Sequence, residues 1–346
     1  MNMNMNKKTF GIIIGTIAVL IVVVLIGIVI ANNHNEKVIY SGNIISQNVE
    51  NSTKQEEQNI AQNNTTSDNT TAENDEKIEG EISYAETKDG GKIPVPPTFK
   101  YVDGESQKGA IIEDENGNQF VWVPVDDYNS YHREYFAKNG EKKDDYSDDV
   151  EVTFESSGIK DINYYNEEFD DSIRNYKGFY IARYEAGKEK KGNKNIAVSK
   201  AGVLPWTQIV WEEARDASLK MYAENDKFQT DLVNSYAWDT TCNWLRNTGI
   251  NIDNSVNYGN YQNSSNGTRK VVETASNERW QTNNIFDMAG NVWEYTTEEI
   301  GDHEKHHIGR GGAHWNNGDE YPISSRAQAS DESNLDVGFR VVLYLK

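Results

Sequence analysis

The sequence predicts a loop-rich α+β domain at the C-terminal end of a chain of 346 residues. Two observations support this fold class. Runs of aromatic and β-branched residues near positions 120 and 180 are typical of strands, and apolar residues recur at helical spacing between positions 207 and 249. Two helices, few strands and long segments rich in Asn, Gly and Ser favour an α+β domain over a sandwich or a barrel.

The first element is an uncharged apolar segment at residues 10–31. A helix of this length spans roughly 33 Å, which is enough for the hydrocarbon core of a membrane. Lys7 and Lys8 precede it, so the positive-inside rule places residues 1–9 in the cytoplasm and the rest outside the cell. We therefore expect a single-pass signal anchor in the cell membrane. The alternative is a signal peptide cleaved after Ala31, which would leave a secreted protein.

Residues 32–92 follow as a polar segment, without a single aromatic residue between Ser41 and Ser83. Such a segment cannot bury enough apolar area to offset chain entropy, so it is expected to be a disordered stalk. All eight tryptophans lie beyond residue 120. The folded domain is therefore predicted at residues 93–346, opening near Pro94.

Composition limits the classes of partner. A net charge of −21 argues against nucleic acid, because phosphate binding needs clustered Lys and Arg. Acidic side chains can instead supply oxygen ligands for calcium. Cys242 is the only cysteine, so the domain has no intramolecular disulfide and depends on its core.

The elements of the domain are predicted in order along the chain. A strand at Phe120–Val125 precedes an acidic, poorly patterned inserted loop at Asp144–Asp171, and a second strand covers Gly178–Glu185. One helix runs from about Thr207 to Met221. The remaining two elements are a helix that begins with Ser235 as its N-cap and ends at Gly249, and a closing strand at Gly338–Leu345.

Three blocks in a fixed order carry a family resemblance: Asn284–Thr296 (Asn-Ile-Phe-Asp-Met-Ala-Gly-Asn-Val-Trp-Glu-Tyr-Thr), Arg310-Gly-Gly312 and Gly338-Phe-Arg340. Together they resemble the formylglycine-generating enzyme (sulfatase-modifying factor) family, which folds as an elaborated C-type-lectin-like domain. The segments Phe179–Glu185, Leu204–Ala214 and Tyr236–Asp239 are also similar to that family. The resemblance covers about residues 100–346.

A structural calcium site is implied at the first block. Asp287 and Glu294 would bind through carboxylates, and Gly290 and Val292 through main-chain carbonyls. Calcium takes six to eight oxygen ligands of these two kinds. The alternative is a glycine-containing turn with Trp293 in the core and both acids in hydrogen bonds.

The family's oxidative chemistry is not supported. It uses two cysteines after the Gly-Gly block to bind Cu(I), and the corresponding positions here are Asn316 and, near the second one, Tyr321. Oxygen ligands do not replace thiolates for this soft ion, so neither copper nor formylglycine synthesis is expected. Cys242 lies on the apolar stripe of a predicted helix and is expected to be a buried small hydrophobe.

An alternative enzyme would use a metal bound by histidines. His303, His306, His307 and His314 flank the Gly-Gly block. Their spacing matches no common zinc pattern, and solvated histidines are ordinary in a charged loop. A catalytic role is therefore an open alternative rather than the expected one.

The loop at residues 313–325 is the predicted recognition surface, because rigid rings beside Asn and Ser are typical of adaptable binding surfaces. Its proposed ligand-binding residues are His314, Trp315, Asn316, Asn317, Asp319, Glu320, Tyr321 and Ser324. The ligand would be a surface glycan, peptide or protein. The alternative is that Trp315 packs inward. Arg326 and Arg340 are expected to brace this loop.

The predicted function is thus a membrane-anchored extracellular binding protein on a catalytically inactive scaffold. The C-terminal arrangement also resembles the variable binding proteins of diversity-generating retroelements, which is a second alternative.

Overall fold

The computed structural model describes residues 80–134, 136–138, 141–142, 159–161, 167–223, 225–300, 306–329 and 334–346. The chain divides into two compact units, Met1–Ala72 and Glu73–Lys346, and the described residues all belong to the second. The predicted cytoplasmic segment, the anchor at residues 10–31 and most of the stalk lie outside them. Within the described ranges, no helix is both long and apolar enough to cross a membrane.

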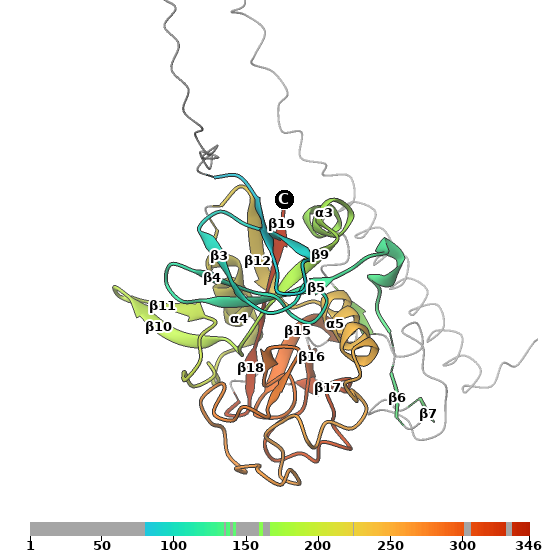
Figure 1. Ribbon diagram of the computed structural model, residues 1–346. Helices are drawn as coiled ribbons and strands as arrows, with labels where there is room; N and C mark the ends of the chain where they lie inside the picture. Colours follow the sequence, from blue (N-terminus) through green and yellow to red (C-terminus); the bar gives the residue numbers. More distant parts are fainter. Residues whose placement is uncertain are drawn as a thin grey trace, which may run out of the picture. The chain divides into compact units, whose positions relative to one another are not determined.

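A six-stranded antiparallel sheet forms the centre of the domain (Figure 1). Its strands, in spatial order, are β12 (Phe228–Leu232), β19 (Val341–Leu345), β9 (Gly178–Ala182), β5 (Gln119–Pro124), β4 (Ile111–Asp114) and β3 (Phe99–Asp103). The strands predicted near residues 120 and 180 are confirmed as β5 and β9.

Both faces of this sheet are covered, because alternate residues of each strand enter different hydrophobic clusters. In β5, Phe120 belongs to one cluster and Val121 to the other. In β19, Leu343 and Val342 are divided in the same way. Helix α4 (Trp211–Lys220) packs against β12, and helix α5 (Ser235–Asn247) packs against β5.

A second, five-stranded sheet carries the blocks that the sequence singled out. Its strands are β17 (Arg326–Ala329), β16 (His306–Arg310), β15 (Trp293–Ile300), β18 (Val337–Phe339) and, paired with the far end of β15, β8 (Ile159–Asp161). The β15–β18 pair is parallel and the other pairs are antiparallel.

Short elements complete the described domain (Figure 1). They are β1 (Ser83–Glu86), β2 (Lys92–Val95), η1 (Tyr128–Ser130), β6 (Ala137–Lys138), β7 (Glu141–Lys142), α3 (Glu167–Asp171), η2 (Ser172–Tyr176), β10 (Gly187–Lys191), β11 (Lys194–Val198), β13 (Gln281–Thr282) and β14 (Ile285–Phe286). Strand β1 pairs with β2 and lies within the segment predicted as stalk, so regular structure begins before residue 93.

Both predicted helices exist, but their N-terminal boundaries differ from the prediction. The first helix cannot begin near Thr207, because Gln208 has a φ of 55° and α4 starts only at Trp211. In the second, Asn234 is the N-cap, and its side-chain oxygen accepts from the Ala237 amide at 2.8 Å. Ser235 instead donates its hydroxyl to Asp161 at 2.6 Å.

The predicted closing strand is two strands in two different sheets. Its residues form β18 and β19, which are separated by Arg340. This side chain is fully buried, donates to both carboxylate oxygens of Glu294 in β15, and reaches the carbonyl of Ala182 in β9 at 3.0 Å. Arg340 therefore joins the two sheets and does not brace the 313–325 loop, contrary to the expectation.

The acidic segment at Asp144–Asp171 is also more structured than an inserted loop where it is described. Residues 143–158 lie outside the described part, but β8 pairs with β15 and α3 follows. Asp161 is buried, and its carboxylate accepts from Ser235 and, at 2.7 Å, from Thr297. The sequence did not indicate that Asp161 is buried, because it lies among many acidic residues that are typical of an exposed loop.

Candidate functional site

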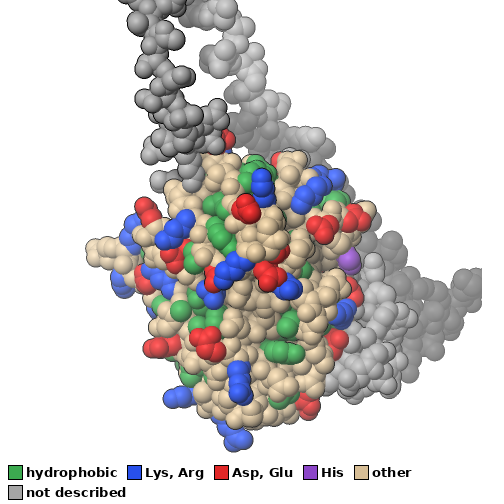
Figure 2. All heavy atoms as spheres, viewed as in Figure 1, with side chains coloured by type: hydrophobic (Ala, Val, Ile, Leu, Met, Phe, Trp, Pro, Cys, Tyr) green, Lys and Arg blue, Asp and Glu red, His purple; other side chains and the backbone are tan. Residues whose placement is uncertain are grey.

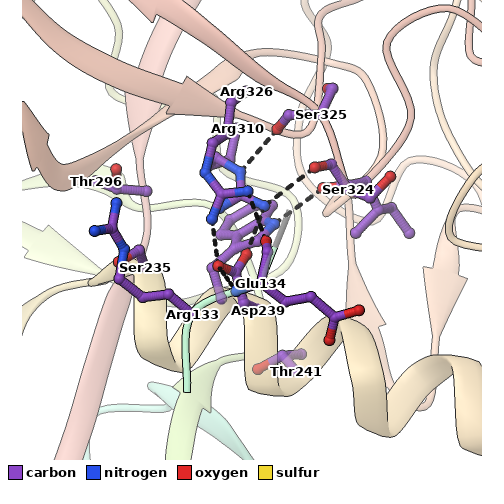
Figure 3. A network of polar contacts seen from close by, with 12 residues as sticks. Arg133, Glu134, Ser235, Asp239, Thr241, Thr296, Arg310, Ser324, Ser325 and Arg326 are labelled. Carbon is purple, nitrogen blue, oxygen red and sulfur yellow. Dashed lines mark hydrogen bonds and ion pairs between the residues drawn. The ribbon is translucent and has the colours of Figure 1, made fainter. Parts of the chain in front are cut away.

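A buried network of ion pairs lies beneath the candidate recognition loop (Figure 3). Asp239 of α5 and Glu298 of β15 are both fully buried. Arg310 of β16 lies 2.8 Å from Asp239, and Arg326 of β17 lies 3.0 Å from Glu298 and also binds Asp239. Arg133 reaches the same Glu298 oxygen at 2.8 Å. One helix (α5) and three strands (β15, β16 and β17) are therefore held together by charge-assisted hydrogen bonds.

The charge balance of this network keeps Glu298 ionised. Burial alone would raise its pKa, but the guanidinium groups of Arg326, Arg310 and Arg133 outweigh that effect and lower it to about 2. The network is costly to break, because removing one partner leaves another charge buried without compensation.

The network holds the C-terminal end of the 313–325 loop. Arg310 donates to the Ser325 carbonyl at 2.7 Å and to the Ser324 carbonyl at 3.2 Å. The indole of Trp238 in α5 donates to the Ile323 carbonyl at 2.9 Å. Three consecutive carbonyls of the loop are thus fixed by buried side chains.

The N-terminal end of the loop is fixed by the Gly-Gly block. Gly311 and Gly312 have φ values of 86° and 76°, which residues other than glycine rarely adopt. A Cβ at Gly311 would lie 2.6 Å from the Met288 carbonyl oxygen, and one at Gly312 would lie 2.5 Å from the Tyr321 carbonyl oxygen. The buried Tyr261 hydroxyl donates to the Gly311 carbonyl at 2.6 Å.

Trp315 is the most exposed ring of the loop, with half of its surface accessible. Its indole nitrogen donates to the carboxylate of Asp336, which lies just before β18. The ring therefore points outward, and the alternative that it packs inward is not what the structure shows. Asp336 went unnoticed in the sequence because it belongs to none of the family blocks.

The other predicted binding residues lie at different depths. Asn316 is buried, and its side-chain oxygen accepts from the Ala313 amide at 2.8 Å, so it closes the turn. Ser324 is also buried and donates to Asp253 at 3.3 Å. Tyr321 is half-buried against the ring of Trp293, with 5.7 Å between ring centroids.

The remaining predicted residues are partly or fully accessible. The half-buried His314 ring contacts the Asn291 carbonyl at 3.1 Å. Asn317 donates to the exposed Glu320 at 3.1 Å, and Asp319 accepts from Asn263 at 2.9 Å. The accessible part of the predicted set is therefore His314, Trp315, Asn317, Asp319, Glu320 and Tyr321.

The predicted calcium ligands belong to a buried acidic cluster. Asp287, Glu294 and Glu185 are all buried, and Arg340 is the cation that binds Glu294. Glu185 accepts from the Asn291 side chain at 2.6 Å and from the Val292 amide at 3.2 Å. Its pKa is raised well above the usual range by burial and by the neighbouring carboxylates of Asp287 and Glu294. Glu185 was part of a family block but had no role assigned from sequence.

The two predicted carboxylate ligands of calcium differ in their availability. Both oxygens of Glu294 are bound by Arg340, at 2.5 and 2.8 Å. Asp287 accepts from the Ala275 amide at 2.9 Å through one oxygen, and its other oxygen is buried without a hydrogen-bond partner. Burial raises the pKa of Asp287 to about 7. Calcium at this oxygen, with the Gly290 and Val292 carbonyls as the other ligands, stays a prediction.

The histidines that the structure describes form no common metal site. His303 lies outside the described residues. His306 and His307 are consecutive in β16, so their side chains point to opposite faces, and the buried His307 ring stacks on Trp211 with 3.8 Å between centroids. Within the described part of the chain, no three His, Cys, Asp or Glu side chains are placed to hold a metal ion together.

Comparison with models of known protein families identifies the family of this domain. Residues 137–345 match the model of the sulfatase-modifying factor enzyme 1-like domain, which is more than half of the chain. The chain belongs to this family. A search of curated proteins found no significant match.

Solved structures of similar proteins are distant from this family member. CarF shares 15% identity over 49% of this chain and 87% of its own, with a TM-score of 0.38. PvdO from Pseudomonas aeruginosa shares 12% identity over 68% of this chain and 98% of its own, with a TM-score of 0.39. Treponema denticola variable protein 1 shares 14% identity over 71% of this chain and 99% of its own, with a TM-score of 0.37.

This member of the sulfatase-modifying factor family has no thiol at the positions where the family resemblance implies the copper ligands. Asn316 closes a turn there, and Tyr321 packs on Trp293. Cys242 is fully buried in α5, and burial raises the pKa of its thiol far above the usual range. A neutral, enclosed thiol is neither a nucleophile nor a metal ligand.

Proposed function

We propose that this protein binds a ligand outside the cell through the 313–325 loop and does not produce formylglycine. The observation that carries the proposal is Trp315, a half-exposed ring whose orientation is held by Asp336. A large ring that is already ordered loses little conformational entropy on binding, so it can contribute contact area at low cost.

The surroundings of Trp315 support recognition rather than chemistry. Asn317, Asp319 and Glu320 follow it in the loop with partly or fully accessible polar groups, which can hydrogen-bond a ligand that stacks on the ring. Both ends of the loop are held by buried groups, through Gly311 at one end and Arg310 at the other. Rigid support of this kind reduces the ordering cost of binding.

The remaining parts of the proposal rest on the sequence and on the acidic cluster. The uncharged segment at residues 10–31 would anchor the protein in the cell membrane, and the stalk would hold the domain away from it. Calcium would be a structural ion, held by Asp287 with the carbonyls of Gly290 and Val292. The buried, unpartnered oxygen of Asp287 supports this assignment.

The test is binding of the full-length chain, in nanodiscs of neutral lipid, to glycan and cell-surface arrays with calcium and with a chelator. We expect a ligand that is retained by the wild type and lost by Trp315→Ala. Tyr84→Ala is the matched control, because Tyr84 is another exposed ring and lies in β1, outside the loop. Trp315→Phe keeps a ring but loses the bond to Asp336, so it should bind more weakly than the wild type.

The outcomes separate the parts of the proposal. Loss of binding in Trp315→Ala but not in Tyr84→Ala supports recognition by the loop. Equal binding by all variants contradicts it. A chelator effect that accompanies a fall in melting temperature supports a structural calcium ion, whereas a chelator effect without one would mean that the ion contacts the ligand.

A further inference from the structure

A lysine-rich hairpin stands apart from the acidic character of the chain. Strands β10 and β11 pair from Gly187–Val198 to Lys191–Lys194. Residues 187–200 contain five lysines and one glutamate, a net charge of +4, in a chain whose net charge is −21. Figure 1 shows this hairpin projecting away from the sheets at one edge of the domain.

The charge of the hairpin is only partly compensated. Lys200 pairs with Glu189 at 2.8 Å. Lys188, Lys190, Lys191 and Lys194 are all exposed, and the described residues provide none of them with an ion pair. Figure 2 shows Lys and Arg side chains interspersed with Asp and Glu over one face of the domain.

Two of these lysines oppose each other at the tip. Lys191 and Lys194 are direct register partners across the antiparallel pair. Side chains in such positions have Cβ atoms about 5 Å apart, and like charges there are destabilising. Gly192, with a φ of 62°, makes the tight turn that brings them together. A bound anion would remove this repulsion.

The arrangement of the lysines indicates the form of that anion. Lys188 and Lys190 share one face of the hairpin, whereas Lys191 and Lys194 share the other, because side chains alternate along a strand. The tip residues Gly192 and Asn193 carry no apolar group that could enter a bilayer. A flexible polymer can contact the lysines on both faces of the hairpin. A flat membrane would contact the lysines on only one face, so the arrangement favours a polymer.

The residue type indicates the charged group. The hairpin contains lysine but no arginine, so it lacks the planar fork that binds carboxylates and phosphates bidentately, and its contacts are those of point charges. Lysine binds phosphate as a point charge and does not require a fixed geometry.

The base of the hairpin is held against the domain by a contact between a lysine and an aromatic ring. The Lys188 ammonium lies 5.4 Å from the centroid of the Trp206 ring.

We propose that the β10–β11 hairpin binds a linear phosphate polymer through Lys188, Lys190, Lys191 and Lys194. The interaction is electrostatic and independent of the 313–325 loop. At physiological salt the screening length is about 8 Å, so the projecting hairpin is shielded from much of the acidic surface behind it.

The test uses the full-length chain in nanodiscs of neutral lipid and inorganic polyphosphate as the probe. The hairpin variant replaces Lys188, Lys190, Lys191 and Lys194 with Gln. The control variant replaces four exposed, ion-paired lysines, Lys88, Lys100, Lys108 and Lys220, with Gln, which changes the net charge equally. Binding is measured at 50 and 200 mM salt, together with the melting temperature of each protein.

We expect the hairpin variant to lose at least tenfold in affinity and the control variant to lose less than threefold. Wild-type affinity should fall by about fiftyfold between the two salt concentrations, as four phosphate contacts on a single-stranded polyanion predict. The hairpin variant should melt close to the wild type, because Gln at positions 191 and 194 removes the repulsion whereas Gln at position 188 loses the contact with the Trp206 ring. Trp315→Ala should bind polyphosphate normally, which separates this inference from the proposed function.

Three results would overturn the proposal. The first is absence of polyphosphate binding at 50 mM salt. The second is equal loss of binding in the hairpin and control variants, which would indicate a general charge effect. The third is hairpin-dependent binding that is tighter to phosphatidylglycerol vesicles or to polygalacturonate than to polyphosphate, which would assign the surface to a membrane or to a carboxylate polymer.

Discussion

Arg310 of β16 lies 2.8 Å from Asp239 of α5, and both side chains are completely buried. The same arginine donates to the carbonyls of Ser324 and Ser325, so one residue connects the interior of the domain to the candidate recognition loop. Stability of the network and shape of the loop are therefore coupled.

Asp239→Asn should destabilise the domain strongly, because it removes a charge that binds both Arg310 and Arg326. We expect a loss of roughly 3–5 kcal/mol, the cost of leaving buried charges unpaired. Urea unfolding measures it. Asp216→Asn is the control, since Asp216 pairs with Lys220 on the exposed side of α4 and should change stability by about 0.5 kcal/mol or less. Similar losses in both variants would contradict the account of the network.

Stability should fall with acidification in a range set by Glu298. Its folded pKa of about 2 lies below the unfolded value, so the unfolded chain takes up its proton first as pH falls. Its contribution, on the order of 3 kcal/mol, is present above about pH 4.5 and is lost progressively toward pH 2. The unfolding free energy, measured from pH 6 to 3, should therefore decrease as the pH falls below about 4.5. In Glu298→Gln the slope should be shallower; an unchanged slope would assign the acid sensitivity to other groups.

Gly311→Ala should cost more stability than Gly117→Ala, although both glycines have similar positive φ values, 86° and 82°. At Gly117 an added Cβ meets nothing within 4 Å, so only the backbone penalty of about 1–2 kcal/mol applies. At Gly311 the same atom would lie 2.6 Å from the Met288 carbonyl oxygen. Melting temperatures of the two variants provide the comparison. If they are equal, close packing of the Gly-Gly block against residue 288 is not required.

Calcium should raise the melting temperature of the wild type but not of Asp287→Asn. A calcium concentration of about one hundred times the dissociation constant adds roughly 2.7 kcal/mol to the free energy of unfolding. Asp319→Asn is the matched control, because Asp319 lies in the recognition loop rather than in the acidic cluster. Thermal unfolding with calcium and with a chelator measures the effect. A calcium response that persists in Asp287→Asn would place the ion elsewhere.

Sequence reasoning located the main blocks because each has a local signal. The strands β5 and β9 are aromatic and β-branched runs, and the helix α5 shows an apolar stripe from Trp238 to Leu245. The Gly-Gly block and the terminal Gly-Phe-Arg block identified the family. These features depend on residues that are close together in the chain.

The partners of these blocks could not be predicted, because they are far apart in sequence. Asp239 binds Arg310 and Arg326, which follow it by 71 and 87 residues. No spacing rule links such positions. The closing strand was predicted as one element because its residues are uniformly apolar except for Arg340, and only the position of Glu294 shows why the chain changes sheets there.

The candidate site divides in the same way. Composition identified Trp315 as a binding residue, but its partner Asp336 has no local signal. Asn316 and Ser324 were grouped with the accessible residues because polar side chains are usually exposed. Both are buried, since each satisfies a hydrogen bond that holds the loop in place.

The most direct test of recognition by the loop is the affinity of Trp315→Ala for a ligand retained on the arrays, measured at equilibrium beside the wild type and Tyr84→Ala. Loss of a central ring in a binding surface typically costs about 2 kcal/mol, which is roughly thirtyfold in affinity. We expect such a loss in Trp315→Ala alone, with the melting temperature unchanged. Wild-type affinity in Trp315→Ala would contradict it and would place recognition on another surface of the domain.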